Sequence, residues 1–330
     1  MATEPALDLI SEALQLVRLS GALLFRVDLS APWSLLTGGY PKLPPPASHM
    51  TAFHVVLEGE CWVGLDGDAP QRLLAGDAVI LPRAAAHRLS DQPSRESVRV
   101  ADLLGDTPLS RVRDLRWGGD GPRTRVLCGF LGYEHAAFTP LYDALPPLFC
   151  VRLGEGGSGQ PLDALLRYAE NEVVSRRPGS TGLRLRMAEL LFVESLRRHI
   201  AVLPQDEASW LAGVRDPLVG RAMALLHESP QRSWTVTMLA QSAASSRSVL
   251  AARFHTLLGE PPMHYLARWR MSLAAGRLRN SRDTIDAIGE AVGYRSSAAF
   301  QRAFKRWIGA TPAQWRHEGE QGTRQTAGPS

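Results

Sequence analysis

The chain has 330 residues, of which 45% are hydrophobic and 21% charged, and its formal net charge is +4 at pH 7. This length and composition allow a substantial buried core and suggest a soluble globular protein with two domains of ordinary size. No stretch offers about 18 uninterrupted apolar residues, and Asp8, Glu12 and Arg18 interrupt the amino terminus, which argues against a membrane-spanning helix and a secretion signal. Three cysteines are too few and too irregular for a secreted disulfide framework, so we expect a cytoplasmic protein.

Charge is distributed unevenly along the chain. Residues 216–330 hold 15 Lys and Arg against 8 Asp and Glu, a net charge of +7, whereas the remainder carries −3. A basic carboxyl-terminal third suggests contact with a polyanion, although an arginine-rich helical face is also commonly just solvated.

Residues 21–151 show short apolar runs separated by Gly, Pro and Asp, which is typical of an all-β sandwich or barrel. We assign residues 1–151 to this domain. A two-residue turn at residues 58 and 59 would make FHVVLEGECWV a hairpin and place His54 and Cys61 diagonally on one face.

From residue 159 the pattern changes to apolar residues three and four apart, which predicts amphipathic helices over 159–203. Their apolar side chains can pack within the chain or form a subunit contact, and the sequence leaves both open: Leu185, Leu190, Leu191 and Val193. Residues 204–209 are expected to be a hinge, and 216–316 to be helical throughout. Residues 317–330 have almost no apolar content, which predicts a disordered tail.

The helical region repeats one frame about fifty residues apart. RFHTLLGEPPMHY is followed by RAFKRWIGATPAQW, so that four positions correspond: Phe254 and Phe304, Gly259 and Gly309, Pro262 and Pro312, Tyr265 and Trp315. In each copy a short helix and a tight turn precede a longer helix that ends at the glycine. This order defines a helix-turn-helix unit.

Each long helix has an apolar stripe and an opposite polar face. The expected core positions are Leu250, Phe254 and Leu257 in the first copy and Phe300, Phe304 and Trp307 in the second. The residues expected to face outward, near the start of each helix, are Arg247, Ser248 and Ala251 and then Ser297, Ala298, Gln301 and Arg302. A helix presented in this way can enter a major groove, where arginine pairs with guanine and glutamine with adenine. Ser246 and Ser296 can cap the helices and can also contact phosphate. Lys305 is a further candidate for a phosphate contact.

The segment IGEAVGYRSSAAFQRAFKRWIGATPAQWR resembles the signature of the AraC-type (AraC/XylS) transcription regulators, and the similarity extends over residues 216–316. The resemblance implies two helix-turn-helix units joined by a long helix, here residues 262–280, which read successive major grooves of double-stranded DNA. Two positions depart from the pattern: Ala244 stands where a turn glycine is common, and Gly289 where a helical alanine is common. A positive φ at Ala244 would be strained.

The amino-terminal half resembles the cupin-type sensor domain of one branch of this family. Gly76, Pro82 and His87 match the second cupin motif, with Ala84 at a usual glycine position. The first motif, with its His-x-His and Glu, is missing from PPPASHMTAFHVVLEG. A cupin metal enzyme fused to a nucleic-acid-binding domain is therefore the less favoured alternative.

Two kinds of ligand remain open for the barrel. Zinc or another transition metal would use thiolate and imidazole ligands, for which the candidates are Cys61, His87, Cys128 and His135, although buried cysteines are commonly just small apolar residues. A small-molecule effector would bind in the mouth of the barrel among Phe53, His54, Trp62 and His87. We therefore expect a non-enzymatic regulator, with RNA polymerase as a further partner and a homodimer as its assembly.

Overall fold

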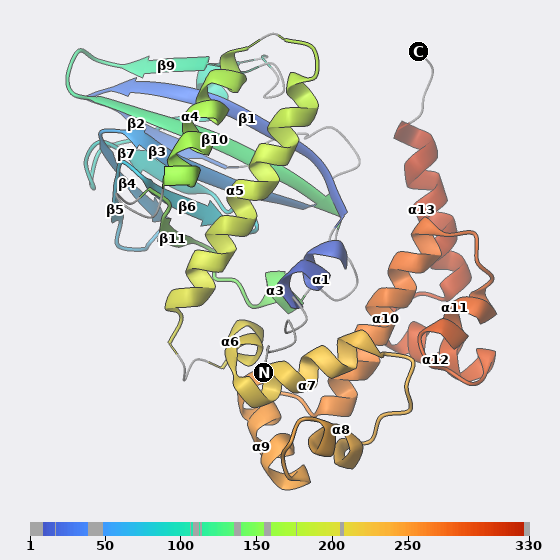
Figure 1. The fold of residues 1–330 in the computed structure, drawn as a ribbon. Helices are drawn as coiled ribbons and strands as arrows, with labels where there is room; N and C mark the ends of the chain where they lie inside the picture. The colour runs from blue at the N-terminus through green and yellow to red at the C-terminus, as the bar shows by residue number, and fades with distance from the viewer. Residues whose placement is uncertain are drawn as a thin grey trace. The chain divides into compact units, whose positions relative to one another are not determined.

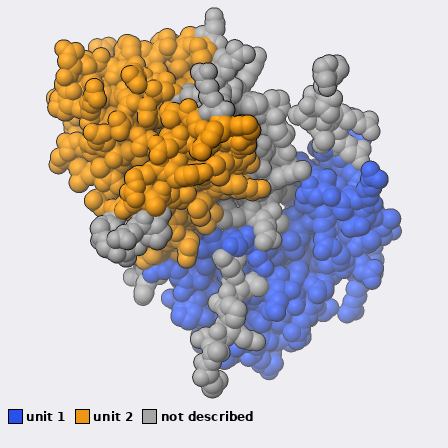
Figure 2. All heavy atoms as spheres, turned by 45° about the horizontal axis from the view of Figure 1, so that its top comes forward, with its two compact units in different colours: residues 1–18, 134–144, 203–330 blue, residues 19–133, 145–202 orange. Residues whose placement is uncertain are grey.

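The computed structural model describes residues 9–16, 18–38, 49–105, 107, 112, 114–134, 140–154, 160–175, 177–204 and 208–326. Contacts within the chain define two units, coloured separately in Figure 2. The barrel unit comprises residues 19–133 and 145–202, and the helical unit comprises residues 1–18, 134–144 and 203–330. Among the helices that the structure describes, we find none with the length and hydrophobicity of a membrane span.

The barrel unit consists of two sheets, as the strand pattern predicts. The six-stranded sheet has the order β11 (Phe149–Arg152), β6 (Asp77–Leu81), β3 (His49–Glu58), β10 (Arg123–Glu134), β1 (Arg18–Ser30) and β9 (Asp114–Gly118). The five-stranded sheet has the order β5 (Gln71–Leu74), β4 (Glu60–Leu65), β7 (His87–Ser90), β2 (Ser34–Thr37) and β8 (Val98–Arg99), followed by the short helix α2 (Val100–Leu104).

The expected hairpin at residues 58 and 59 is wrong, because β3 and β4 belong to different sheets. β3 pairs with β6 and β10, whereas β4 pairs with β5 and β7. Gly59 turns the chain between the two sheets at φ +76°, where a Cβ would lie 2.3 Å from the carbonyl oxygen of Arg123. Only glycine fits this close approach, so the residues that look like a hairpin turn form a corner of the barrel.

Two helices complete the barrel unit. α4 (Gln160–Val174) and α5 (Ser180–Val202) pack on each other, and α5 also packs on β6 and β11 (Figure 1). The ring of His199 stacks on Phe149 at 4.2 Å between centroids. The region predicted as a connector over 159–203 is therefore grouped by its contacts with the barrel. The expected hinge falls largely on residues 205–207, which lie outside the described residues.

The carboxyl-terminal part of the helical unit contains the two predicted helix-turn-helix copies. It begins with α6 (Trp210–Arg215) and α7 (Pro217–Glu228). The first copy is α8 (Val236–Ser242) and α9 (Arg247–Leu258), the second is α11 (Ile285–Ala291) and α12 (Ser297–Ile308), and α10 (Pro262–Asn280) lies between them in the chain (Figure 1). The last helix is α13 (Pro312–Thr326).

α10 contributes to the cores of both copies. Towards its start, Tyr265 packs edge-on against Phe254 of α9, with 5.6 Å between ring centroids. Towards its end, Met271, Ala274, Ala275 and Leu278 join Phe300 and Phe304 of α12 in one buried cluster. A single continuous helix therefore fixes the position of the two copies relative to each other.

The predicted disordered tail is wrong for residues 317–326, because α13 continues to Thr326. The helix starts at Pro312 and is held on α10 by Trp315, whose indole donates to the carbonyl oxygen of Ala275 at 3.1 Å. Arg279 lies over the same indole at 4.0 Å. Once such a packed turn exists, each further residue adds a hydrogen bond at little cost, so the helix extends through a polar sequence.

Two segments outside residues 203–330 also belong to the helical unit, α1 (Leu9–Leu16) and α3 (Pro140–Asp143). α1 packs on α3, α7 and α10, and α3 also packs on α6. Leu9 and Ala13 are buried there. The division by contacts therefore differs from the expected boundary at residue 151, because two pieces of the amino-terminal half pack with the carboxyl-terminal helices.

Candidate functional site

The two long helices α9 and α12 have the same local construction. Ser246 caps α9 by accepting from the N–H of Val249 at 3.3 Å, and Ser296 caps α12 by accepting from the N–H of Ala299 at 3.2 Å. Each helix ends at a glycine in the left-handed region, Gly259 and Gly309. These caps fix where each helix begins and ends, and so fix which side chains form its first turns.

The buried stripes agree with the sequence. Leu250, Phe254 and Leu257 are buried in α9, and Phe300 and Phe304 are fully buried in α12. Trp307 is only partly buried, because it lies beside His264 at the border of the cluster. With these stripes turned inward, the opposite face of each helix is open to solvent.

Most of the predicted base-contacting and phosphate-contacting side chains are on this open face. The exposed residues are Arg247, Ser248, Ala298, Gln301, Arg302 and Lys305, with the caps Ser246 and Ser296, while Ala251 and Ser297 are half-buried. Arg302 and Lys305 are exposed, and neither forms an ion pair within the part of the chain that the structure describes. Their cationic groups are therefore available to a partner.

The second copy contains an interaction that the sequence does not predict. Ser297 donates to the carboxylate of Asp286 in α11, and the side-chain amide of Gln301 donates to the Ser297 hydroxyl at 3.0 Å. Gln301 and Ser297 are four residues apart in α12, whereas Asp286 lies eleven residues earlier. Only the packing of the two helices brings it within reach, and it orients Gln301 before any ligand is bound.

The turns of the two copies differ by one residue and share one left-handed position. Three residues separate α8 from the Ser246 cap, and four separate α11 from the Ser296 cap. Ala244 in the first turn has φ 56° and Gly293 in the second has φ 92°. The expected strain at Ala244 is therefore confirmed. The packing also explains the glycine at position 289, because an added Cβ would lie only 3.0 Å from the ring of Phe300.

This difference leads to a prediction on stability. Replacing Ala244 with glycine should stabilise the helical unit by about 1 kcal/mol, because an L side chain is disfavoured at positive φ. Replacing Gly293 with alanine should destabilise it by more, because the Cβ would also lie 2.7 Å from the carbonyl oxygen of Gln231. Urea unfolding of both variants measures the effect. A loss of stability in Ala244→Gly would contradict the strain argument.

Comparison with known proteins decides the family. Residues 8–201 match the cupin family model and residues 239–318 a helix-turn-helix domain model. The chain is similar to two proteins named putative AraC-like transcription regulators: one from Streptomyces lividans is 35% identical over 88% of this chain and 94% of its own length, and one from Streptomyces antibioticus is 34% identical over the same shares. The chain belongs to the AraC-like transcription regulators.

Among solved structures, the DNA-binding domain of AdpA in complex with a target DNA is 30% identical and covers 33% of this AraC-like chain and 98% of its own, with a TM-score of 0.32. The relatives are named as regulators, so the alternative of a cupin metal enzyme is set aside. The chain is a DNA-binding transcription regulator with an amino-terminal cupin domain.

The interior of the barrel of this AraC-like regulator holds a buried hydrogen-bond chain. His54 Nε2 lies 2.8 Å from His87 Nε2, His54 Nδ1 lies 2.9 Å from Cys128 Sγ, and His87 Nδ1 lies 2.8 Å from the carbonyl oxygen of Ala85. The Thr37 hydroxyl also lies 2.6 Å from His87 Nε2 and donates to the carbonyl oxygen of His87 at 2.9 Å. One assignment of protons satisfies the three contacts of the chain. His87 Nδ1–H donates to Ala85, His54 Nε2–H donates to His87 Nε2, and the Cys128 thiol donates to His54 Nδ1.

The ionisation of these groups agrees with that neutral chain. Burial lowers the pKa of His87 to about 4 and holds the pKa of His54 well below its usual value. Burial also raises the pKa of the Cys128 thiol, and that of Cys61 to about 12. At neutral pH both imidazoles are uncharged and both thiols are protonated.

The strand register shows which predicted effector residues share the interior. His54 pairs with Cys128 and Val79 across the six-stranded sheet, so these three share a face. Phe53, the next residue along β3, lies on the opposite face, where its ring occupies the space beside Gly129. Trp62 follows the inward-facing Cys61 in β4 and therefore points outward. The predicted pocket of Phe53, His54, Trp62 and His87 is thus wrong for two of its four members.

The predicted metal ligands do not come together as a set. His135 lies outside the described residues. Within the described ranges, no group of three or more His, Cys, Asp or Glu side chains is placed to hold a metal ion. Cys61 and Cys128 are both buried in the barrel interior, but Cys128 contacts His54, and His87 contacts His54 and the Thr37 hydroxyl, which lies 2.6 Å from its Nε2. We therefore propose no metal for this site.

The two buried histidines predict a pH-dependent stability. Their pKa values in the folded protein lie below the ordinary value near 6.5, so the unfolded chain binds protons first as pH falls. Their contribution to the free energy of unfolding is fully present above about pH 6.5 and is lost as pH falls towards 4. The melting temperature should therefore drop between pH 7 and pH 5. His54→Gln combined with His87→Gln should reduce that drop, and an unchanged pH profile in the double variant would contradict the assignment.

A second buried chain was not predicted from sequence, because it joins residues up to 253 positions apart. In the helical unit, His227 Nδ1 lies 2.9 Å from Glu12 of α1, and His227 Nε2 lies 2.8 Å from the hydroxyl of Tyr265, which also accepts from the Trp210 indole at 2.9 Å. The His227 ring stacks on Trp269 at 3.6 Å. Burial lowers the pKa of His227, so a neutral ring can donate to Glu12 and accept from Tyr265.

Proposed function

We propose that α9 and α12 enter successive major grooves on one face of a promoter and that the second copy supplies most of the base readout. Arg302 presents a fork of donors that matches guanine, and Gln301 matches adenine. Ser297 and Ala298 would lie beside them. The first copy offers Arg247 with the small residues Ser248 and Ala251, which leave room for a thymine methyl but carry fewer donors. The shared α10 core supports this arrangement, because it holds both copies on one helix.

The phosphate contacts follow from the same geometry. The caps Ser246 and Ser296 lie at the amino ends of the reading helices, where backbone N–H groups favour an anion, and Lys305 is exposed one turn after Gln301. Each phosphate contact releases counterions, so operator affinity should fall steeply as salt increases. We infer that the protein acts in the cytoplasm, where promoter DNA is located.

We infer that an effector in the barrel unit changes DNA binding through α1 and α3. Both helices pack within the helical unit, and the chain continues from α1 into β1 and from α3 towards β11. A shift of the ends of these strands would therefore displace α1 and α3, which contact α7, α10 and α6. The mechanism would be a shift between two arrangements, limited by how strongly the effector prefers one of them.

We also propose that the regulator acts as a homodimer through α5. Leu183 and Leu190 are exposed on this helix and lie seven residues apart, which puts them on one face after two turns. Buried positions such as Leu191 lie on the inner side of α5. The exposed leucines Leu183 and Leu190 are therefore available to a second subunit. RNA polymerase is the partner that a promoter-bound regulator would contact.

The duplicated, capped and exposed first turns of α9 and α12 are the observation that carries this proposal. The test is to incubate the purified full-length protein with fragmented genomic DNA at physiological salt and to sequence the DNA fragments that remain bound to it. We expect enrichment of a few promoter fragments, including some that share one motif about two helical turns long. Retention equal to that of random DNA, with and without cell extract, would contradict the proposal.

A further inference from the structure

The start of α12 carries a hydrogen-bond relay, Asp286–Ser297–Gln301, that fixes which way the Gln301 amide group points. The Ser297 hydroxyl has a single proton, and it donates this proton to the Asp286 carboxylate, which can only accept. The Ser297 oxygen therefore offers Gln301 only lone pairs. Gln301 must turn its –NH2 group towards them, and its Nε2 donates to Ser297 at 3.0 Å. The second N–H and the oxygen Oε1 of the exposed Gln301 then form the edge that is left for a base.

The first copy has different residues at all three positions of the relay. Counted from the capping residue of each helix, Asp286, Ser297 and Gln301 correspond to Thr237, Arg247 and Ala251. These three residues supply neither the carboxylate nor the amide, so they cannot form the same chain. The relay is therefore particular to the second copy, which supplies most of the base readout in the proposed function.

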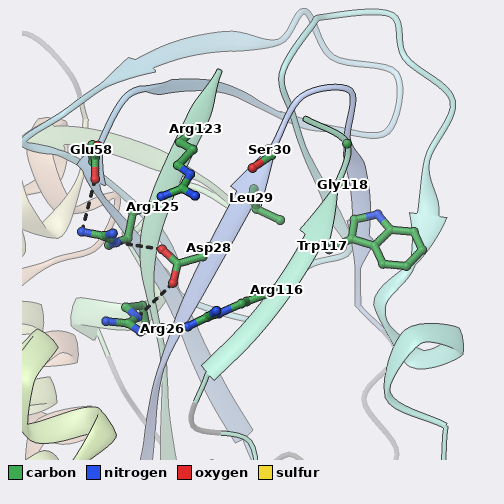
Figure 3. Close-up of a pocket in the computed structure, with 11 residues that line it drawn as sticks. Arg26, Asp28, Leu29, Ser30, Glu58, Arg116, Trp117, Gly118, Arg123 and Arg125 are labelled. Carbon is green, nitrogen blue, oxygen red and sulfur yellow. Dashed lines mark hydrogen bonds and ion pairs between the residues drawn. The ribbon is translucent and has the colours of Figure 1, made fainter. Parts of the chain in front are cut away.

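The charged cavity of the barrel unit has the opposite character, because carboxylates of the chain already occupy its arginines. Asp28 contacts both Arg26 and Arg125 there (Figure 3). The lining includes four arginines, and four carboxylates pair with arginines of this cavity: Asp28, Glu58, Asp114 and Glu170. Those charges balance within the chain, whereas Gln301 in the described part of α12 uses only one of its N–H groups.

We propose that Asp286 is a specificity-determining residue that makes Gln301 select adenine over guanine, an inference that rests on the proposed function. Both purines present the acceptor N7 in the major groove, but beside it adenine has the donor N6 and guanine the acceptor O6. With its amide fixed, Gln301 donates to N7 and accepts from N6 of adenine. In front of guanine its Oε1 would face O6, and two acceptors leave each other unpaired.

Removing the carboxylate would release the proton of Ser297. The hydroxyl can then donate to Oε1 of Gln301, so the amide can turn over and place its –NH2 group opposite O6 of guanine. Asp286 touches no base in this arrangement, and both Asp286 and Ser297 are positioning residues that act through Gln301. The exposed charge of Asp286 also repels phosphate, which weakens binding to any DNA alike, so its distinct contribution is the rejection of guanine.

The test uses the full-length protein and an operator obtained by genomic retention, in which each adenine is replaced in turn by guanine with its partner base changed to match. The position read by Gln301 is the one where the unchanged protein prefers adenine and Gln301→Ala does not. There we expect the preference for adenine over guanine to be about tenfold in the unchanged protein and about twofold in Asp286→Ala and in Ser297→Ala. Preferences that depend on Arg302 should stay the same.

Glu290→Ala is the matched control. It removes the same charge one turn further along α11, and Glu290 lines the same cavity as Asp286 and Ser297. It should keep the tenfold preference. In a Gln301→Ala background, Asp286→Ala should not change the ratio of the two affinities any further, because Asp286 acts through Gln301. Thermal unfolding by circular dichroism checks that every variant is folded.

Four results would overturn the inference. They are that no adenine position depends on Gln301, that Asp286→Ala keeps the full preference, that Glu290→Ala loses it equally, or that Asp286→Ala changes the ratio in the Gln301→Ala background. A lack of any operator preference in the unchanged protein is a different result, because it would overturn the proposed function and this inference with it.

Discussion

Replacing Arg302 with alanine is expected to weaken binding to a matched operator by about tenfold to a hundredfold and to leave binding to scrambled DNA almost unchanged. A bidentate arginine–guanine contact contributes about 1–3 kcal/mol of discrimination against a wrong base. Arg302 is exposed in the first turns of α12 and forms no ion pair within the described residues, so its donors are free for a base. Titration of both DNAs with the variant measures the ratio of affinities.

Two controls separate base readout from charge. Arg306→Ala removes an exposed charge from the last turn of the same helix, and it should weaken both DNAs alike. Arg247→Ala should reduce discrimination less than Arg302→Ala, because its neighbours Ser248 and Ala251 are small. Equal losses on matched and scrambled DNA for Arg302→Ala would rule out its role in base readout.

Replacing Phe304 with alanine is expected to destabilise the second helix-turn-helix copy by about 3–5 kcal/mol. The ring is fully buried in the cluster that α12 shares with α10, beside Phe300 and Trp315 at 5.7 and 6.4 Å between centroids. Removing a buried aromatic ring loses its burial energy and leaves a cavity. Because α12 depends on this cluster for its position, operator binding should be lost together with the fold of that copy.

Urea unfolding followed by circular dichroism measures this change. Phe254→Ala, at the corresponding position of α9, is the matched control and should destabilise the first copy by a similar amount. Phe304→Leu keeps most of the buried volume and should cost much less. An unfolding curve for Phe304→Ala that coincides with that of the unchanged protein would show that the cluster does not hold α12.

The duplicated helices were predictable from sequence because their signals are local. Ser246, Ser296, Gly259 and Gly309 act on their own helix ends, and the apolar stripes repeat at helical spacing. Even the strain at Ala244 could be anticipated, since the turn of a helix-turn-helix unit requires a left-handed residue. These features depend on neighbours within a few residues, and the structure agrees with them.

The barrel was predicted as a fold, but not in its details, because strand pairing depends on distant residues. The apparent hairpin at Gly59 is a corner between sheets, and a change of pairing decides which side chains face inward. For this reason Trp62 and Phe53 were wrongly placed beside His54. The Glu12–His227 contact likewise joins segments 215 residues apart, for which no local pattern exists.

We propose that α10 holds the two reading helices at one fixed spacing on the duplex. The most direct measurement is the affinity of the full-length protein for its operator with five base pairs inserted between the two half-sites. Five base pairs turn the second half-site to the opposite face of DNA, since one helical turn takes about 10 base pairs. We expect the affinity to fall to the level of a single half-site. Unchanged affinity after the insertion would contradict it.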